Sequence, residues 1–179
     1  MPINSKNDGN LNFTTNINYT RNASLINSVK NYIGDVSIGE EIRFSYNYDD
    51  KLDLGVNASI TYSNATYSIQ KGQTNSYFTH NYSLDATYSF NHGIIFSTNG
   101  DYVFYSGSSG DFNQGYFIWN ASIAKQLFKN ERGEIAFSVN DILNQATNIS
   151  RIRADNFIED VQTTTLKRFA LLTFTYHLR

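Results

Sequence analysis

The stretch that decides the fold reads LDLGVNASITYS, from Leu52 to Ser63. Every even position is apolar, and every odd position is polar or glycine. Because successive side chains of a strand point to opposite faces, this stretch predicts a strand with one apolar and one polar face. Its polar residues are mostly small and neutral, whereas a face in bulk water carries more Lys, Glu and Arg. We therefore expect the apolar face to point outwards.

The composition fits one domain of strands over residues 1–179. Charged residues make up 17% of the chain, compared with about 25% in a typical soluble domain. Aromatic residues reach 15%, and the single proline is Pro2. Long strands tolerate aromatic residues well and proline poorly, so the composition favours an all-β fold and not a disordered chain.

Several classes of function find no support in the residues. The formal net charge is −2, and without a basic patch we expect no nucleic-acid partner. The chain has no cysteine, and His80, His92 and His177 have no ligand-type residue at metal-binding spacing, so we expect neither a metal site nor a cofactor. No nucleophile elbow, phosphate loop or dinucleotide fingerprint occurs, and we expect no catalytic residues and no enzymatic activity.

Alternation with a period of two predicts eight antiparallel strands and no helix. The fifth and sixth strands are noisier, because Ile95, Val103 and Ile118 fall on the polar face. The expected strands span approximately residues 10–21, 36–49, 52–63, 76–90, 93–105, 114–128, 133–140 and 165–178.

The expected connections alternate between short and long. Short turns are predicted at 50–51, 91–92 and 130–133, and longer loops at 22–35, 64–75, 106–113 and 141–164. An even strand number with short turns at one end and long loops at the other is typical of outer-membrane barrels. The pattern thus predicts an antiparallel up-and-down transmembrane β-barrel. A soluble lipocalin-like barrel also has eight such strands but does not require this alternation of loops.

Aromatic residues cluster where the expected strands end. Barrels carry aromatic girdles at both membrane interfaces, about 25 Å apart. The residues near the short turns are Tyr46, Tyr48, Tyr88, Phe90 and Phe128, and those at the opposite ends are Tyr62, Tyr102, Phe104 and Tyr105.

The polar face is the candidate functional surface. If it lines a water-filled lumen, its amides and hydroxyls can hydrogen-bond sugars, peptides or water, although a packed interior without ligand is an equal alternative. The candidate lumen-facing residues are Asn57, Ser59, Thr61, Asn81, Ser83 and Asp85.

The last forty residues resemble the carboxyl end of the Bacteroidota outer-membrane β-barrel family of TonB-dependent receptor type. Residues 141–145, DILNQ, are similar to the motif that closes the penultimate strand of that family. Ser150-Arg151 and the stretch 157–160, FIED, match an outer loop, while Leu166, Arg168, Phe169 and residues 172–179 match the final strand. The resemblance covers about a fifth of the chain, and its motif residues are Asp141, Asn144, Arg151 and Arg168.

The resemblance implies a ligand-gated importer with a barrel of about 22 strands, a plug domain, and transport driven by the TonB complex. We expect this chain to be the carboxyl-terminal part, without plug or signal peptide, which meets TonB only through the missing amino-terminal part. The expected partners are outer-membrane lipid, an unknown small substrate, and the barrel-assembly machinery, although the ending Tyr176-His177-Leu178-Arg179 departs from that machinery's usual aromatic end. The alternatives are a stand-alone eight-stranded structural or adhesive barrel and the soluble lipocalin type.

Overall fold

Ten strands make up the fold in a computed structural model, which describes residues 7–69, 74–107, 113–128, 132–153, 158–164 and 166–178. None of the described segments is a helix that is long and apolar enough to cross a membrane. The strands are β1 (Asn7–Ile26), β2 (Val29–Tyr48), β3 (Leu52–Tyr67), β4 (Thr74–Phe90), β5 (Ile94–Gly107), β6 (Gln114–Leu127), β7 (Gly133–Asn140), β8 (Thr147–Arg153), β9 (Ile158–Thr164) and β10 (Phe169–Tyr176).

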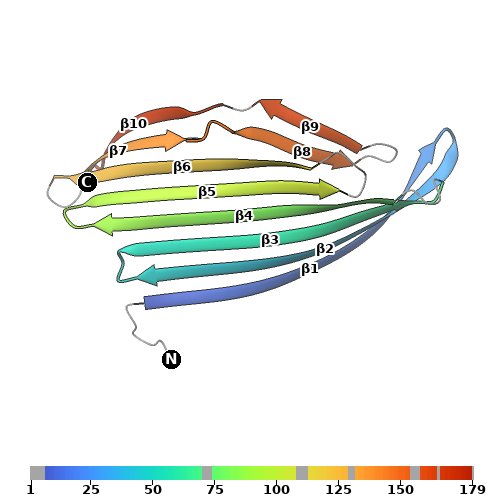
Figure 1. Cartoon of the computed structure of the whole chain (residues 1–179), viewed down its shortest axis with the longest axis horizontal. Coiled ribbons are helices and arrows are strands. Elements are labelled where there is room, and N and C mark those ends of the chain that lie inside the picture. Colours follow the sequence, from blue (N-terminus) through green and yellow to red (C-terminus); the bar gives the residue numbers. More distant parts are fainter. Residues whose placement is uncertain are drawn as a thin grey trace.

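Eight of these strands form one antiparallel up-and-down sheet in the order β1-β2-β3-β4-β5-β6-β7-β10. The predicted strand number and topology are confirmed. The start of β1 and the end of β10 lie at the same end of the sheet as the short turns (Figure 1). The sheet remains open, because β1 and β10 are its two edges and do not pair with each other.

The register is continuous between every pair of neighbouring strands. One cross-strand row contains Leu11, Phe44, Val56, Leu84, Gly100 and Trp119. The next row contains Asn12, Arg43, Asn57, Ser83, Asp101 and Ile118. Because the register never slips, most apolar residues accumulate on one face and most polar residues on the other.

The apolar face has no protein packed against it. Ala65 is the one buried hydrophobic side chain in the described part of the chain, whereas Phe13 is 69% exposed and Leu172 72% exposed. A water-soluble domain of this size would bury such side chains in a core. The exposed apolar face instead fits a hydrocarbon environment.

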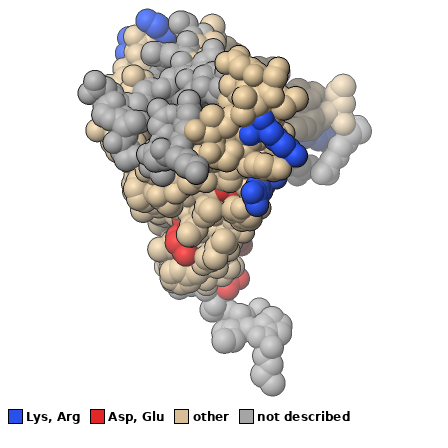
Figure 2. Space-filling view, turned by 90° about the vertical axis from the view of Figure 1, so that its right-hand side faces the viewer, with Lys and Arg blue, Asp and Glu red and all other residues tan. Residues whose placement is uncertain are grey.

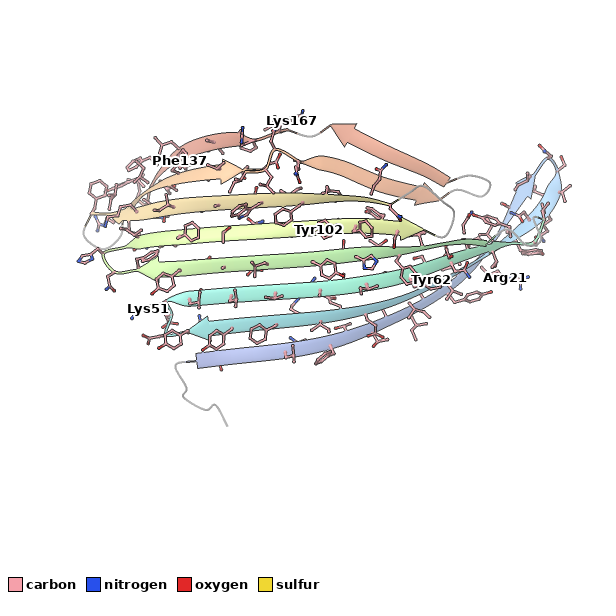
Figure 3. All side chains as sticks on the ribbon, viewed as in Figure 1. Arg21, Lys51, Tyr62, Tyr102, Phe137 and Lys167 are labelled. Carbon is pink, nitrogen blue, oxygen red and sulfur yellow. The ribbon has the colours of Figure 1, made fainter. Side chains whose placement is uncertain are left out.

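Aromatic side chains contact each other near both ends of the sheet, between neighbouring strands at one end and within β4 at the other. At the end away from the short turns, the rings of Tyr62 and Phe78 are 5.0 Å apart. At the turn end, the rings of Tyr88 and Phe90 are 4.6 Å apart. Figure 3 labels Tyr62 toward one end and Lys51, in a short turn, at the other. Aromatic side chains therefore lie toward both ends of the sheet, as expected for two girdles.

The prediction of a long loop at residues 22–35 is wrong. Strands β1 and β2 continue through this segment and are joined by the two-residue turn Asn27-Ser28. Both turn residues have positive φ, 48° and 65°, as the type I′ turns that match strand twist require. The hairpin therefore extends past the rest of the sheet (Figure 1).

The prediction of a long loop at residues 141–164 is also wrong, because this segment contains the separate hairpin β8–β9. The last strand of the large sheet begins at Phe169 and not at residue 165. The short connections expected at 50–51 and 91–92 are present as turns at 49–51 and 91–93. Parts of the other predicted connections, residues 70–73, 108–112 and 129–131, lie outside the described residues.

Candidate functional site

The six predicted lumen-facing residues share one face of β3 and β4. The register places Asn57 opposite Ser83 and Ser59 opposite Asn81. The Nδ2 atom of Asn81 donates a hydrogen bond to Ser59 Oγ at 3.3 Å. In the same register Thr61 lies opposite Thr79, and Asp85 lies opposite Gly55. The alternation that defined this face in the sequence thus becomes a continuous polar surface.

Hydrogen bonds between side chains extend the polar surface over β4, β5 and β6. Thr87 Oγ1 donates to Ser97 Oγ at 3.1 Å. The amide of Asn120 donates to Asn99 Oδ1 at 3.4 Å, and the amide of Asn99 donates to Asp101 Oδ2 at 3.2 Å. Such side-chain networks hold amides and carboxylates at fixed positions, which suits a surface that selects solutes by hydrogen bonding.

Among the six predicted lumen-facing residues, Asn57 keeps unused bonding capacity. The Oδ1 atom of Asn57 is buried and has no hydrogen-bond partner within the described residues. A buried acceptor without a partner is costly, so it is normally satisfied by water or a ligand. Asn57 is therefore the predicted residue that most needs a partner on the polar face.

The polar face is hollowed toward the short-turn end of the sheet. A cavity of about 530 Å³ lies there, lined in part by Asp8, Asn47, Asp53, Gly55 and Asp85. Gly55 keeps it open, because a Cβ atom at this position would collide with the Asp85 carboxylate. Within the described ranges no group of three or more His, Cys, Asp or Glu residues could hold a metal ion.

Negative charge dominates this face in the described strands. Arg43 is its one basic side chain and forms an ion pair with Glu41, with Nη2 and Oε1 3.0 Å apart. The acidic residues that the register places on the face are Asp8, Asp35, Glu41, Asp53, Asp85, Asp101 and Glu134. Such an imbalance creates a negative potential that attracts cations and repels anions.

Near its turn, the β1–β2 hairpin carries two basic side chains, Arg21 and Lys30, and Figure 2 shows Lys and Arg atoms on the surface at this end of the molecule. The Arg21 guanidinium lies 4.8 Å and the Lys30 ammonium 5.1 Å from the centre of the Tyr32 ring. Both distances are within the range of a cation–π interaction. Both cations are therefore held against the same ring of β2.

Asp141 holds the turn that follows β7. Its side chain is 3% exposed, and its two carboxylate oxygens accept hydrogen bonds from the backbone N–H groups of Gln145 and Ala146, both at 2.9 Å. Its own N–H donates to Asn120 Oδ1 at 2.9 Å. These contacts give Asp141 a structural role, since a carboxylate that accepts backbone N–H groups fixes the path of a turn.

The same turn brings two other motif residues together. Arg168 donates from its backbone N to Asn144 Oδ1 at 3.2 Å and from its guanidinium to the carbonyl of Ile142 at 3.3 Å. The fourth motif residue, Arg151, lies on β8, opposite Asp160 of β9, and its side chain lies outside the described residues.

Sequence reasoning missed two residues that the structure makes important. Asn120 joins the polar network to the Asp141 turn, although only its place in an alternating strand was visible in the sequence. Gly100 shapes the outer surface, but a lone glycine in a strand gives no sign of what lies across from it.

Together, an antiparallel sheet with an exposed apolar face, a polar opposite face and aromatic groups at both ends defines an integral β-barrel protein of the outer membrane. The chain belongs to the family described as "Outer membrane protein beta-barrel family", which it matches over residues 3–176. No curated protein and no solved structure matches it. The protein is therefore located in the bacterial outer membrane, and the soluble lipocalin-like alternative falls away.

Proposed function

We propose that this chain forms the carboxyl-terminal part of the barrel wall of an importer of the TonB-dependent receptor type. Its polar face would line the interior, and its outer loops would help to admit a small substrate. The observation that carries the proposal is the open sheet, in which β1 and β10 remain separate edges. The similarity of residues 140–179 to that receptor type supports the same assignment.

Open edges are the energetic argument for a larger wall. In hydrocarbon, each backbone N–H or C=O group without a partner costs several kcal/mol. β1 alone is twenty residues long, so its free edge requires another strand. In the proposed receptor, preceding strands of a wider barrel pair with β1 and β10 and remove both edges.

Apolar residues on the inner face support a packed interior. Ile95, Val103 and Ile118 lie on the polar face according to the register of β5 and β6. Leu171 of β10 shares this face and is 51% exposed. A barrel whose interior contained only water would not favour apolar side chains on its inner face, whereas a plug domain inside the barrel would cover them.

The charge of the inner face indicates the substrate class. Acidic side chains and neutral amides and hydroxyls outnumber the single Arg43 in the described strands. This arrangement favours polar solutes that are neutral or cationic over anions. We propose that TonB acts through an amino-terminal part, and that the barrel-assembly machinery inserts the chain by its last strand.

Single cysteines test which face lines the lumen, because the chain has none of its own. Ser59→Cys and Ala58→Cys place the thiol on opposite faces of β3 at the same depth. In vesicles, we expect a water-soluble maleimide to label Ser59→Cys and not Ala58→Cys, and a lipid-soluble maleimide to label Ala58→Cys. Equal labelling of both variants by the water-soluble reagent would contradict the assignment.

The stand-alone eight-stranded barrel is distinguished by refolding the 179-residue chain in detergent. With open edges, we expect associated species and no compact monomer whose gel mobility changes on heating. A heat-modifiable monomer that does not conduct ions would instead support a small closed barrel, whose interior is filled by side chains.

A further inference from the structure

The outer, apolar face of the sheet carries a groove at its middle. It has a volume of about 550 Å³ and is lined chiefly by Val56, Tyr82, Leu84, Tyr102, Phe117 and Trp119. These side chains belong to β3, β4, β5 and β6, and all lie on the same face. Tyr102 is labelled near the centre of the sheet in Figure 3. This volume is within the range of small-molecule sites, about 300–1,000 Å³.

Gly100 creates the groove. It lies between Leu84 of β4 and Trp119 of β6 in one cross-strand row, and it presents no side chain there. A Cβ atom at this position would come within 3.1 Å of the Phe117 ring, which leans over the glycine. Aromatic cover of a strand glycine is a known stabilising device of sheets, but here it leaves open space on the Leu84 side.

Two polar groups of the groove wall are already engaged. Trp119 Nε1 donates a hydrogen bond to Thr98 Oγ1 at 2.8 Å. Thr98 Oγ1 in turn donates to the backbone carbonyl of Asn120 at 2.9 Å. The indole and hydroxyl therefore have no need of a polar ligand, and the remaining surface is aliphatic and aromatic. Such a wall favours an apolar occupant.

The depth of the groove decides which apolar occupant is available. Val56, at its level, is four residues from Leu52 at the turn end of β3 and six from Tyr62 at the other aromatic group. At about 3.3 Å per residue, the groove lies well inside the hydrocarbon layer. The abundant molecules at that depth are lipid acyl chains.

We propose that this groove is a binding site for one acyl chain of an outer-membrane lipid, which lies over Gly100 against Trp119. The inference depends on the membrane location and on the described contacts, and not on the importer function. The bound chain fills a hollow that would otherwise remain empty and lose dispersion contacts.

The single tryptophan of the chain, Trp119, reports directly on this site. The full chain is reconstituted in phosphatidylcholine vesicles that contain increasing fractions of phospholipid brominated on its acyl chain, and Trp119 fluorescence is recorded. A bound chain predicts quenching that exceeds the mole fraction of brominated lipid by at least about twofold at low fractions.

Gly100→Leu fills the groove, and we expect it to reduce quenching to the level that the mole fraction alone predicts. Gly100→Ala should have an intermediate effect and guards against a folding defect. Ala86→Leu is the matched control, because Ala86 shares the outer face but does not line the groove; we expect its quenching to equal that of the wild type.

Three results would overturn the proposal. Quenching in proportion to mole fraction in the wild type would indicate ordinary lipid around the barrel. Unchanged quenching in Gly100→Leu would place the lipid elsewhere. Absence of quenching would show that protein, such as a second copy of the chain, covers the groove.

Discussion

Single residues act here through their partners across strands. Asp141 illustrates this, because its buried carboxylate fixes two backbone N–H groups in the turn after β7. The same turn positions Asn144, which accepts a hydrogen bond from the backbone N–H of Arg168 immediately before β10. The motif that resembles the receptor family therefore works as a structural junction between the last two strands of the sheet.

We predict that Asp141→Ala lowers the free energy of unfolding by about 2–4 kcal/mol, because it leaves two backbone donors without their charged acceptor. Urea unfolding of the protein in detergent micelles measures the change. Asp8→Ala is the control, since Asp8 is exposed on edge strand β1 and its loss should cost less than about 0.5 kcal/mol. Similar costs for both variants would refute the structural role of Asp141.

For single residues, the sequence predicted on which face of the sheet a side chain lies, but not which side chains of other strands lie beside it. Asn57 and Ser83 were assigned to one face by alternation alone, and the register places them opposite each other. The groove at Gly100 could not be predicted, because it depends on Phe117 and Leu84, which lie 17 and 16 residues away in the chain. Local patterns do not contain the register that brings such residues together.

Among the elements, the hairpin of β1 and β2 departs most from the sequence prediction. Its end projects past the sheet and joins its strands through Asn27 and Ser28, both in the left-handed region. Non-glycine residues in that region carry strain of about 1 kcal/mol or more. The turn is therefore a weak point of an otherwise regular strand pair.

We predict that Ser28→Gly stabilises this hairpin by about 1 kcal/mol, because Asn-Gly is the preferred type I′ turn. Hydrogen exchange of the hairpin amides should slow by roughly fivefold, since local opening sets their exchange rate. Ser24→Gly, within β1, serves as the control and should speed exchange, because glycine weakens a strand interior. Faster exchange in Ser28→Gly would contradict the turn assignment.

Strand boundaries were predictable where alternation was uninterrupted. The predicted limits of 133–140 match β7, and residues 52–63 lie within β3. The segment 22–35 gives no hairpin signal, because its turn contains no glycine and its apolar residues do not alternate cleanly. The sequence does not predict the hairpin β8–β9, because its apolar residues, Ile149 and Ile152 in one strand and Ile158 and Val161 in the other, are three positions apart and do not alternate with a period of two.

For the molecule as a whole, the charge of the inner face governs what approaches it. We predict that the thiol of Ser59→Cys reacts faster with a cationic than with an anionic methanethiosulfonate reagent of similar size. Replacing Asp53, Asp85 and Asp101 by Asn should reduce this ratio of rates by at least about threefold, because the local potential becomes less negative. Stopped-flow labelling in low-salt vesicles measures both rates.

Glu40→Gln is the matched control for this experiment. Glu40 lies on the opposite, apolar face, where Thr15 Oγ1 donates to its Oε2 atom at 2.8 Å. The substitution removes one carboxylate without changing the inner face, so the ratio of the cationic to the anionic labelling rate should stay the same. A ratio that falls equally in this variant would show that the reagents sense the overall charge and not the lumen.

Closure of the wall lies beyond what strand patterns can predict. Period-two alternation specifies which face is apolar, but closure depends on strand number and stagger, which are properties of the complete circle. The described sheet accordingly has the expected faces and topology while β1 and β10 remain edges.

The unbroken register has a consequence for how such a gene can evolve. A hairpin of two consecutive antiparallel strands begins and ends at the same end of the sheet. The pairing between neighbouring strands contains no bulge that would exchange their apolar and polar faces. Duplication or deletion of a coding segment for one hairpin therefore preserves the direction and the inside-outside pattern of all remaining strands. The circumference of the barrel can therefore change in steps of two strands without reversing the faces of the strands that remain.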